Sequence, residues 1–287
     1  MGLFAKTRIL LDMIKFEHTV FALPFAYLGA FLAAKGPPDL RTSLLILLAM
    51  AGARTAAMGF NRIVDVPYDA RNPRTCGRAI PTGKVRMGEA WTMVILASVA
   101  FFLAAFLLNR MAFFLSPFVL AVTLFYSYTK RFSSLCHLFL GLAIGISPTA
   151  GWIAVCGDVG LLPLVVSSGV IFWVAGFDIL YSCLDLEFDR SCGLFSIPAR
   201  YGLKKAFRIS ALFHAIAFIL FAAAGFMAQL GWIYAAGLAV TLVLLVLQRR
   251  IVSPDDLSRM DMAFFTLNGA ISMVLFAATA ASLLVRA

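Results

Sequence analysis

Long apolar runs recur along this 287-residue chain and constrain its fold more than any other feature. Most are about 20 residues long, the length that an α-helix needs to cross the hydrocarbon core of a bilayer. Inside lipid every backbone N–H and C=O group must find a partner within the protein, so runs of this length indicate helices rather than the short alternating strands of a membrane barrel. Charged residues make up only 13% of the sequence, about half the share typical of soluble proteins. The sequence therefore predicts an all-α polytopic membrane protein.

The apolar runs predict nine transmembrane helices. The first run has charged flanks and no small-residue cleavage site, so we interpret it as a retained helix and not as a signal peptide. We expect the spans at residues 18–34, 42–64, 88–108, 111–129, 134–155, 161–184, 206–227, 231–248 and 262–284.

The basic residues predict the orientation of these spans. Nine spans put the two termini on opposite sides of the membrane, and most of the 24 Lys and Arg residues then fall on the side of the N-terminus. Basic loops of membrane proteins stay in the cytoplasm. We therefore predict a multi-pass protein of a bacterial inner membrane, with the N-terminus and the long loops in the cytoplasm. The same distribution explains the net charge of +10 without a nucleic-acid partner.

The second predicted span ends in an acidic cluster, within the segment NRIVDVPYDARNPRT at 61–75. Asn61, Asp65 and Asp69 are spaced by four residues, so they share one face of a helix. Pro67 is expected to break the last turn and to leave Asp69 loosely placed. Aspartates this close to the hydrocarbon are costly, which favours a functional interpretation.

A second acidic cluster ends the sixth predicted span, in the segment FDILYSCLDLEFDR. Asp178, Asp185 and Asp189 share a helix face, with Tyr181 between them. Each cluster is followed by Ile-Pro, then Gly, then Lys. This echo suggests two four-helix units, at about residues 42–155 and 161–284, around a shared cavity, although a chance similarity would look the same.

Five aspartates gathered in this way need a counter-charge, and two sources are open. One is a structural network with neighbouring arginines. The other is Mg²⁺, which takes one or two carboxylates together with phosphate oxygens of a substrate. The repeated spacing favours a metal-bound diphosphate. Arg62, Arg71, Arg74 and Lys130 are then candidate phosphate donors, whereas topology alone explains Arg78, Lys84, Arg86 and Arg131.

Arg54 lies inside the second span, seven residues before Asn61 and therefore two turns deeper on the same face. A buried arginine requires an anion. That anion is either a motif aspartate or a carboxylate of the substrate, and we favour the substrate. The five cysteines show no spacing of a disulfide framework or zinc site, and His18, His137 and His214 are interpreted as packing or interfacial residues.

The two acidic segments resemble the two signatures of the UbiA superfamily of intramembrane aromatic prenyltransferases. They read N-R-x-x-D-x-x-x-D at 61–69 and D-x-x-Y-x-x-x-D-x-x-x-D at 178–189. The segments NPRTCGRAIPTGK, YSYTKR, GLAIGISPTAGW and SIPARYG extend the resemblance over essentially the whole chain. The resemblance implies nine helices in a single domain, arranged around a central cavity that opens laterally to lipid.

The resemblance also implies the activity, the transfer of a polyprenyl group from polyprenyl diphosphate to an aromatic acid in quinone biosynthesis. Asp65 and Asp69 would bind one Mg²⁺, and Asp185 and Asp189 a second, with the diphosphate bridging the two ions. Asn61 would orient this assembly, and Arg54 would hold the carboxylate of the acceptor. Asp178 and Tyr181 are candidate helpers in the ring chemistry, with a structural role for Tyr181 equally open.

Two questions stay open at the level of sequence. The first motif has Arg62 where 4-hydroxybenzoate enzymes typically have aspartate, a pattern more like the branch linked to 1,4-dihydroxy-6-naphthoate and menaquinone. Either acceptor, for ubiquinone or for menaquinone, fits Arg54. The alternative function is a cation-coupled transporter, which also combines repeats with acidic helix ends, but the basic residues beside these aspartates suit a diphosphate better.

Overall fold

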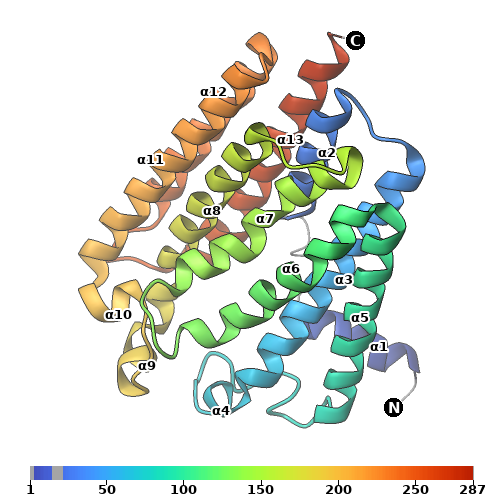
Figure 1. The fold of residues 1–287 in the computed structure, drawn as a ribbon. Helices are drawn as coiled ribbons and strands as arrows, with labels where there is room; N and C mark the ends of the chain where they lie inside the picture. Colours follow the sequence, from blue (N-terminus) through green and yellow to red (C-terminus); the bar gives the residue numbers. More distant parts are fainter. Residues whose placement is uncertain (1–2, 15–21, 287) are drawn as a thin grey trace.

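The computed structural model describes residues 3–14 and 22–286, and every regular element among them is helical. The N-terminus lies at the same end of the bundle as the short helices α4, α9 and α10, and the C-terminus lies at the opposite end (Figure 1). The helices are α1 (Leu3–Met13), α2 (Leu23–Ala34), α3 (Leu40–Val64), α4 (Val66–Asp69), α5 (Met87–Leu108), α6 (Arg110–Thr129), α7 (Cys136–Cys156), α8 (Leu161–Tyr181), η2 (Ser182–Asp185), α9 (Leu186–Ser191), α10 (Ile197–Tyr201), α11 (Leu203–Met227), α12 (Gly231–Ile251), the π-helix η3 (Met262–Leu267) and α13 (Asn268–Leu284).

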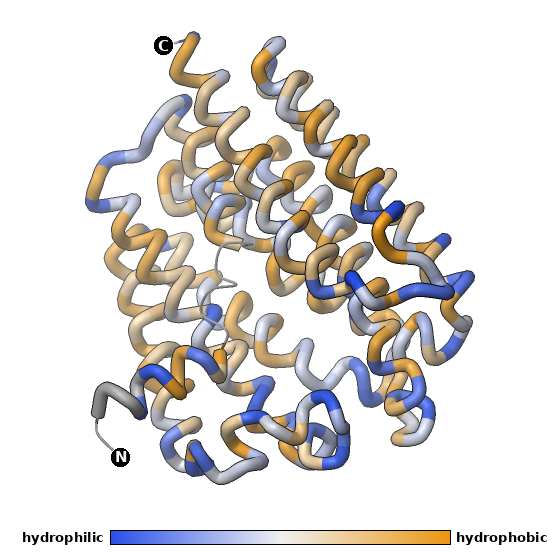
Figure 2. Tube along the Cα trace, turned by 180° about the vertical axis from the view of Figure 1, so that it is seen from behind, coloured by the Kyte–Doolittle hydropathy of each residue, from blue (hydrophilic) through white to orange (hydrophobic). Residues whose placement is uncertain are grey.

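In the described part of the chain, eight helical segments are long and apolar enough to cross a membrane. The count of nine spans was therefore slightly off. The predicted first span, 18–34, corresponds to α2, which has only 12 residues, and part of that span lies outside the described residues. Pro24 stands in the first turn of α2 and Lys35 ends it in a left-handed conformation, so local sequence limits its length. Figure 2 shows the apolar band along the bundle, with hydrophilic segments at its ends.

Small residues bring the central helices into close contact. Gly29 of α2 lies against the backbone of Pro148 in α7, and Gly151 of α7 lies against the backbone of Ala26 in α2. A side chain at either glycine would collide with a carbonyl group of the other helix. Lipid supplies no hydrophobic force between helices, so such close backbone packing is a main source of their association.

The largest apolar cluster joins α2, α8 and α11. The Phe25 ring lies 5.2 Å from that of Trp173 and 6.0 Å from that of Phe221, centroid to centroid. All three side chains are buried. This cluster fixes α8, which carries the second acidic motif, within the bundle.

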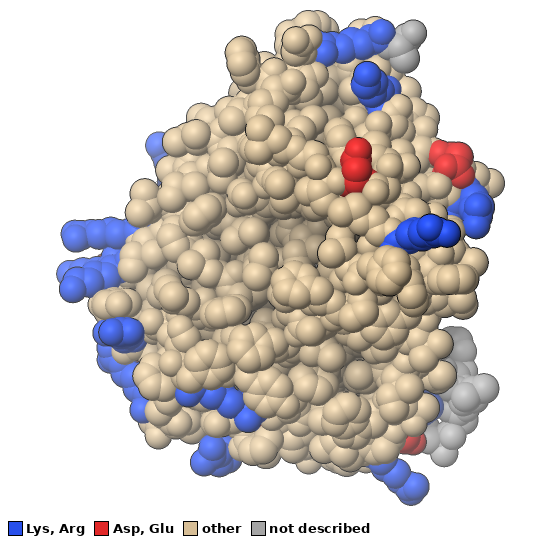
Figure 3. Space-filling view, in the orientation of Figure 1, with Lys and Arg blue, Asp and Glu red and all other residues tan. Residues whose placement is uncertain are grey.

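Both acidic motifs emerge at the same end of the bundle. Helix α3 ends at Val64, and α4 follows directly with Pro67 in its first turn, as expected from a proline at this position. Helix α8 likewise passes into η2 and α9. In Figure 3 basic side chains gather at the rim near this end, while the broad face between the rims is almost free of charge and is hollowed at its centre.

Candidate functional site

A cavity of about 730 Å³ collects the acidic residues of both motifs. Its lining includes every residue that the sequence analysis proposed for the site except Arg71. The lining members of that set are Arg54, Asn61, Arg62, Asp65, Asp69, Arg74, Lys130, Asp178, Tyr181, Asp185 and Asp189.

The first motif is held by its own helix and by the loop that follows it. Asn61 Nδ2 donates a hydrogen bond to Asp65 Oδ2 at 2.9 Å, as their spacing of four predicts. Asp69 is buried, and Arg78 Nη1 lies 2.6 Å from both of its carboxylate oxygens. Burial and the charge of Asp69 raise the pKa of Asp65 to about 6. Asp69 is thus firmly held, contrary to the prediction that Pro67 would leave it loose.

The second motif takes its partners from distant parts of the chain. Arg74 binds Asp185 with two nitrogens, Nε to Oδ1 at 2.9 Å and Nη2 to Oδ2 at 2.5 Å. Asn72 Nδ2 also donates to Asp185 Oδ1, at 3.1 Å. Burial opposes the charge of Arg74, but the hydrogen bond to Asp185 outweighs it and raises the pKa of the guanidinium. Asp185 is therefore neutralised by the loop of the first motif.

Asp189 is fully buried and has two polar partners. Lys130 Nζ forms an ion pair with Asp189 Oδ1 at 2.7 Å, and Ser196 Oγ donates to Asp189 Oδ2 at 2.9 Å. Burial would lower the pKa of Lys130, but the charge of Asp189 raises it above its ordinary value. Lys130 stands at the end of α6, where Phe195 N–H donates to its carbonyl and so ties it to the segment before Ser196.

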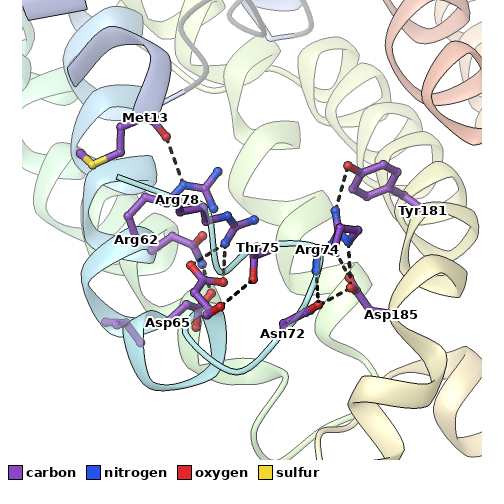
Figure 4. Close-up of polar contacts among 12 residues, drawn as sticks. Met13, Arg62, Asp65, Asn72, Arg74, Thr75, Arg78, Tyr181 and Asp185 are labelled. Atoms are coloured by element: carbon purple, nitrogen blue, oxygen red, sulfur yellow. Dashed lines mark hydrogen bonds and ion pairs between the residues drawn. The ribbon is translucent and has the colours of Figure 1, made fainter. Parts of the chain in front are cut away.

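The loop of residues 70–86 connects the two motifs across the cavity. Figure 4 shows Arg62, Asp65, Thr75 and Arg78 on one side, and Asn72, Arg74, Tyr181 and Asp185 on the other. Arg74 Nη1 also donates to the Tyr181 hydroxyl at 3.2 Å, and its guanidinium lies over the Tyr181 ring. The loop therefore brings an arginine to each motif, Arg78 to Asp69 and Arg74 to Asp185.

The four proposed basic phosphate donors differ in what they can contribute. Arg74 and Lys130 lie against motif aspartates. Arg62 lines the cavity, but its Nε donates to the Met13 carbonyl and so fastens α1 to α3. Arg71 is exposed, donates to the Pro67 carbonyl and lies outside the cavity lining. The structure therefore places Arg71 away from the site that the sequence assigned to it, because the chain turns directly after α4.

Two arginines that topology alone was expected to explain belong to the site. Arg78 pairs with Asp69. Arg131 Nη2 donates to the Val64 carbonyl at 2.7 Å and lies 3.7 Å from Asp65 Oδ1. Asn72, which sequence analysis did not single out, also lies at the site. No periodic signal distinguishes these residues, because a loop and a helix end position them.

His137 also lies in the cavity rather than in simple apolar packing. Its ring is buried, and Nδ1 lies 2.7 Å from Asp178 Oδ2. The backbone N–H of Ile197 donates to Nε2 at 3.2 Å. Helices α7 and α8 and the start of α10 thus meet at this pair.

A second, apolar cavity of about 420 Å³ adjoins the first. It lies among α3, α5, α6, α7 and α8, and its walls are mainly alanine, leucine and isoleucine side chains. Both cavities share five lining residues, which are Arg54, Met58, Tyr126, Leu140 and Ile144. A polar chamber at the end of the bundle therefore adjoins an apolar chamber within it.

The donor set fits a hard divalent ion that is completed by a substrate. In residues 3–14 and 22–286 no three His, Cys, Asp or Glu side chains converge as a ready-made metal site. Aspartates instead line one cavity in two pairs, Asp65 with Asp69 and Asp185 with Asp189. Mg²⁺ is typically bound by one or two carboxylates plus phosphate oxygens and water, so carboxylate pairs suit a Mg²⁺–diphosphate better than a permanent metal centre.

Comparison with known proteins identifies the family. A UbiA homolog from Aeropyrum pernix K1 is 39% identical, with a TM-score of 0.84 over 91% of this chain and 96% of that chain. A UbiA homolog from Archaeoglobus fulgidus bound to GPP and Mg²⁺ shares the fold, with a TM-score of 0.77, 21% identity and coverage of 96% of this chain and 99% of that chain. A 4-hydroxybenzoate octaprenyltransferase of Shewanella oneidensis is 27% identical over 88% of each chain. Residues 22–270 match the model of the UbiA prenyltransferase family. The chain is thus an intramembrane prenyltransferase and belongs to the UbiA prenyltransferase family.

Proposed function

We propose that this enzyme transfers a polyprenyl group from polyprenyl diphosphate to a hydroxylated aromatic acid, in a Mg²⁺-dependent step of quinone biosynthesis. The observation that carries the proposal is the pairing of four aspartates with basic side chains in one polar cavity that adjoins an apolar one. The name of the Shewanella relatives supports 4-hydroxybenzoate as the acceptor. The altered first motif, with Arg62, supports 1,4-dihydroxy-6-naphthoate as the second candidate.

In this proposal Asp65 and Asp69 hold one Mg²⁺, and Asp185 and Asp189 hold a second. The bound GPP and Mg²⁺ of the Archaeoglobus homolog support this use of the fold. When bound there, Mg²⁺ would supply positive charge that stabilises the diphosphate as a leaving group. Asn61, whose amide donates to Asp65, keeps that carboxylate in place.

The basic side chains exchange partners when the substrate enters. Arg74, Arg78 and Lys130 form ion pairs with Asp185, Asp69 and Asp189, respectively. When cations take over these carboxylates, the same side chains turn to the diphosphate oxygens, for which arginine offers bidentate and lysine point-charge contacts. In this proposal the same side chains form the arginine–aspartate network and the diphosphate site, so the two interpretations that the sequence left open are compatible.

The apolar cavity accepts the prenyl tail and keeps water from the allylic cation. Aromatic rings line the polar cavity, where the allylic end of the prenyl tail would lie beside the diphosphate. Tyr181 lies 4.0 Å from Phe264, and Phe177 lies 5.1 Å from Phe264 at a perpendicular angle, measured between ring centroids. Ring faces attract a cation by their quadrupole, and a water-free site prolongs its life.

Arg54 occupies the junction between the two cavities. That location puts a fixed positive charge beside the reactive end of the donor and deeper than the aspartate motifs. We assign it to the carboxylate of the aromatic acid, because a guanidinium binds a carboxylate in bidentate geometry. The ring of the acceptor would then lie between Arg54 and the diphosphate.

The distribution of basic residues supports a bacterial inner membrane location, with the site facing the cytoplasm. The proposed substrates fit that location, because the prenyl donor resides in the bilayer and the aromatic acid is soluble.

The decisive experiment is a prenylation assay in membranes with Mg²⁺ and octaprenyl diphosphate. 4-hydroxybenzoate and 1,4-dihydroxy-6-naphthoate are supplied in parallel, and Asp65→Asn and Asp185→Asn serve as inactive controls. We expect product with one acceptor, lost in both variants and on chelation of Mg²⁺. Turnover that persists after chelation would contradict the metal assignment. No product with either acceptor, despite Mg²⁺-dependent binding of the diphosphate, would contradict the acceptor class alone.

A further inference from the structure

We propose that Asp178 takes the proton from the aromatic ring after prenyl attack and that His137 positions it for this role. The inference rests on the proposed function and assigns a step which that function leaves without a residue. Asp178 lines the site cavity from α8, and its side chain is 21% exposed. His137, from the first turn of α7, is buried behind it.

The hydrogen bonds around His137 fix its protonation. The Ile197 backbone N–H can only donate, so His137 Nε2 must accept this bond. Nδ1 then carries the hydrogen and donates to Asp178 Oδ2 at 2.7 Å. The carboxylate is therefore held through one oxygen, and Oδ1 accepts no hydrogen bond from the described residues. An oriented carboxylate with one oxygen available to the cavity is the arrangement that a general base requires.

The other acidic residues that line the polar cavity either pair with basic side chains or lie at its exposed rim. Asp69, Asp185 and Asp189 pair with Arg78, Arg74 and Lys130. Asp65 accepts from Asn61 and lies beside Arg131, and Asp12 stands on the exposed helix α1 at the rim. Within residues 3–14 and 22–286, Asp178 is the only carboxylate lining the cavity that pairs with a histidine.

Asp178 also lies at about the same depth in the bundle as Arg54, the residue proposed to hold the acceptor. Arg54 precedes Asn61 by seven residues on α3, and Asp178 precedes Asp185 by seven residues along α8 and η2. Each therefore lies about 10 Å deeper than its motif, since an α-helix rises about 1.5 Å per residue. Arg54, Tyr126 and Asp178 line the same polar cavity. A ring held through its carboxylate by Arg54 then presents its carbon atoms toward Asp178.

The chemical step balances with these groups. The ring carbon forms a bond to the allylic carbon and becomes tetrahedral, and the ring carries one positive charge. Asp178 Oδ1 takes the hydrogen of that carbon as a proton, and the C–H electron pair returns to the ring and restores its aromaticity. His137 Nδ1–H keeps its bond to Oδ2 throughout. The neutral Asp178 later gives the proton to water when the product leaves.

Two consecutive residues, Ser196 and Ile197, connect the His137–Asp178 pair to the diphosphate site. Ser196 Oγ donates to Asp189, and the next residue, Ile197, donates its N–H to His137. The segment before α10 therefore fixes the base and the second aspartate motif together. This connection explains why a histidine at the start of α7 is buried with both ring nitrogens in hydrogen bonds.

The test uses the full-length protein and the acceptor that gives product in the prenylation assay, with hydrogen or deuterium at the ring carbon that is prenylated. Asp178→Asn is compared with Asp158→Asn. Asp158 lies in the loop between α7 and α8, and its carboxylate accepts a hydrogen bond from Trp152 Nε1. For Asp178→Asn we expect kcat to fall about 10²–10⁴-fold, with the KM for the prenyl diphosphate unchanged. A primary deuterium isotope effect should appear, since proton loss becomes rate-limiting. Asp158→Asn should match the wild type.

Binding of geranyl thiolodiphosphate, an unreactive probe, distinguishes the outcomes. Normal Mg²⁺-dependent binding by Asp178→Asn without an isotope effect overturns the inference and leaves the proposed function intact. If wild-type protein neither binds the probe nor forms product, the proposed function itself fails. If Asp178→Asn does not fold, His137→Asn and His137→Leu decide. Asparagine retains a hydrogen-bond donor near the position of His137 Nδ1, whereas leucine does not. An isotope effect that appears in His137→Leu but not in His137→Asn supports the inference. If neither variant shows an isotope effect, the inference is overturned.

Discussion

Arg74 and Asp185 are separated by 111 positions in the sequence and form a two-point ion pair, with nitrogen–oxygen distances of 2.9 and 2.5 Å. The arginine belongs to the loop after the first acidic motif, and the aspartate belongs to the second motif. This pair therefore joins the loop after α4 to the second motif at the end of α8. It also neutralises the Asp185 carboxylate, which in the proposed function binds a cation.

Arg74→Ala should lower kcat/KM for the prenyl diphosphate by about 10²–10³-fold, as expected from loss of one preorganised charge at a departing anion. Arg71→Ala is the matched control, because Arg71 lies in the same loop, is exposed and lies outside the cavity lining. The measurement is steady-state kinetics in detergent or nanodiscs. Equal losses in the two variants would contradict the assignment and indicate a general effect of loop charge.

The aspartates of this site could be predicted because helical spacing determines which side chains share a face. Asn61 and Asp65 are four residues apart and hydrogen-bond accordingly. The partners of the aspartates could not be predicted in this way. Arg78 and Asn72 reach the site through an irregular loop, and neighbouring Arg71 turns away because the chain bends after α4.

The same limit applies to contacts between helices. His137 and Asp178 are 41 residues apart and meet only because glycines let α7 approach α8 closely. The short α2 departs from the predicted long first span, since Pro24 and Lys35 delimit it. Periodicity reports the faces of single helices, whereas packing decides which faces meet. The proposed repeat of residues 42–155 and 161–284 accordingly stays a prediction.

Geranyl thiolodiphosphate should stabilise the protein only when Mg²⁺ is present. Binding to the folded state alone adds about 2.7 kcal/mol at a ligand concentration of 100 times Kd, which thermal unfolding detects. The double variant Asp65→Asn with Asp185→Asn should lose this stabilisation, because each proposed ion would lose a carboxylate. Stabilisation of equal size in EDTA would show that Arg74, Arg78 and Lys130 capture the diphosphate without a metal.

Gly151→Ala should destabilise the bundle by about 1–3 kcal/mol, the usual cost of overpacking a tight core. A Cβ atom at this position would collide with the Ala26 carbonyl and force α7 away from α2. Gly36→Ala is the control, since a Cβ atom there meets no heavy atom within 4 Å. Thermal unfolding of both variants in the same detergent gives the comparison. Equal stability of Gly151→Ala and wild type would show that α2 can move away from α7 at little cost.

Ala143→Phe should shorten the longest prenyl donor that the enzyme accepts. Ala143 lies on α7 and lines only the apolar cavity of about 420 Å³, so the larger side chain removes space for the distal part of the tail and leaves the polar cavity unchanged. We expect kcat/KM to fall for octaprenyl diphosphate and to stay near the wild-type value for geranyl diphosphate, because the first isoprene units need only the junction near Arg54 and Tyr126. Ala121→Phe, at an exposed position on α6, controls for the added apolar bulk. A parallel loss for both donors would instead indicate that the substitution disturbs the diphosphate site, and an unchanged preference would place the tail outside this cavity, in the surrounding lipid.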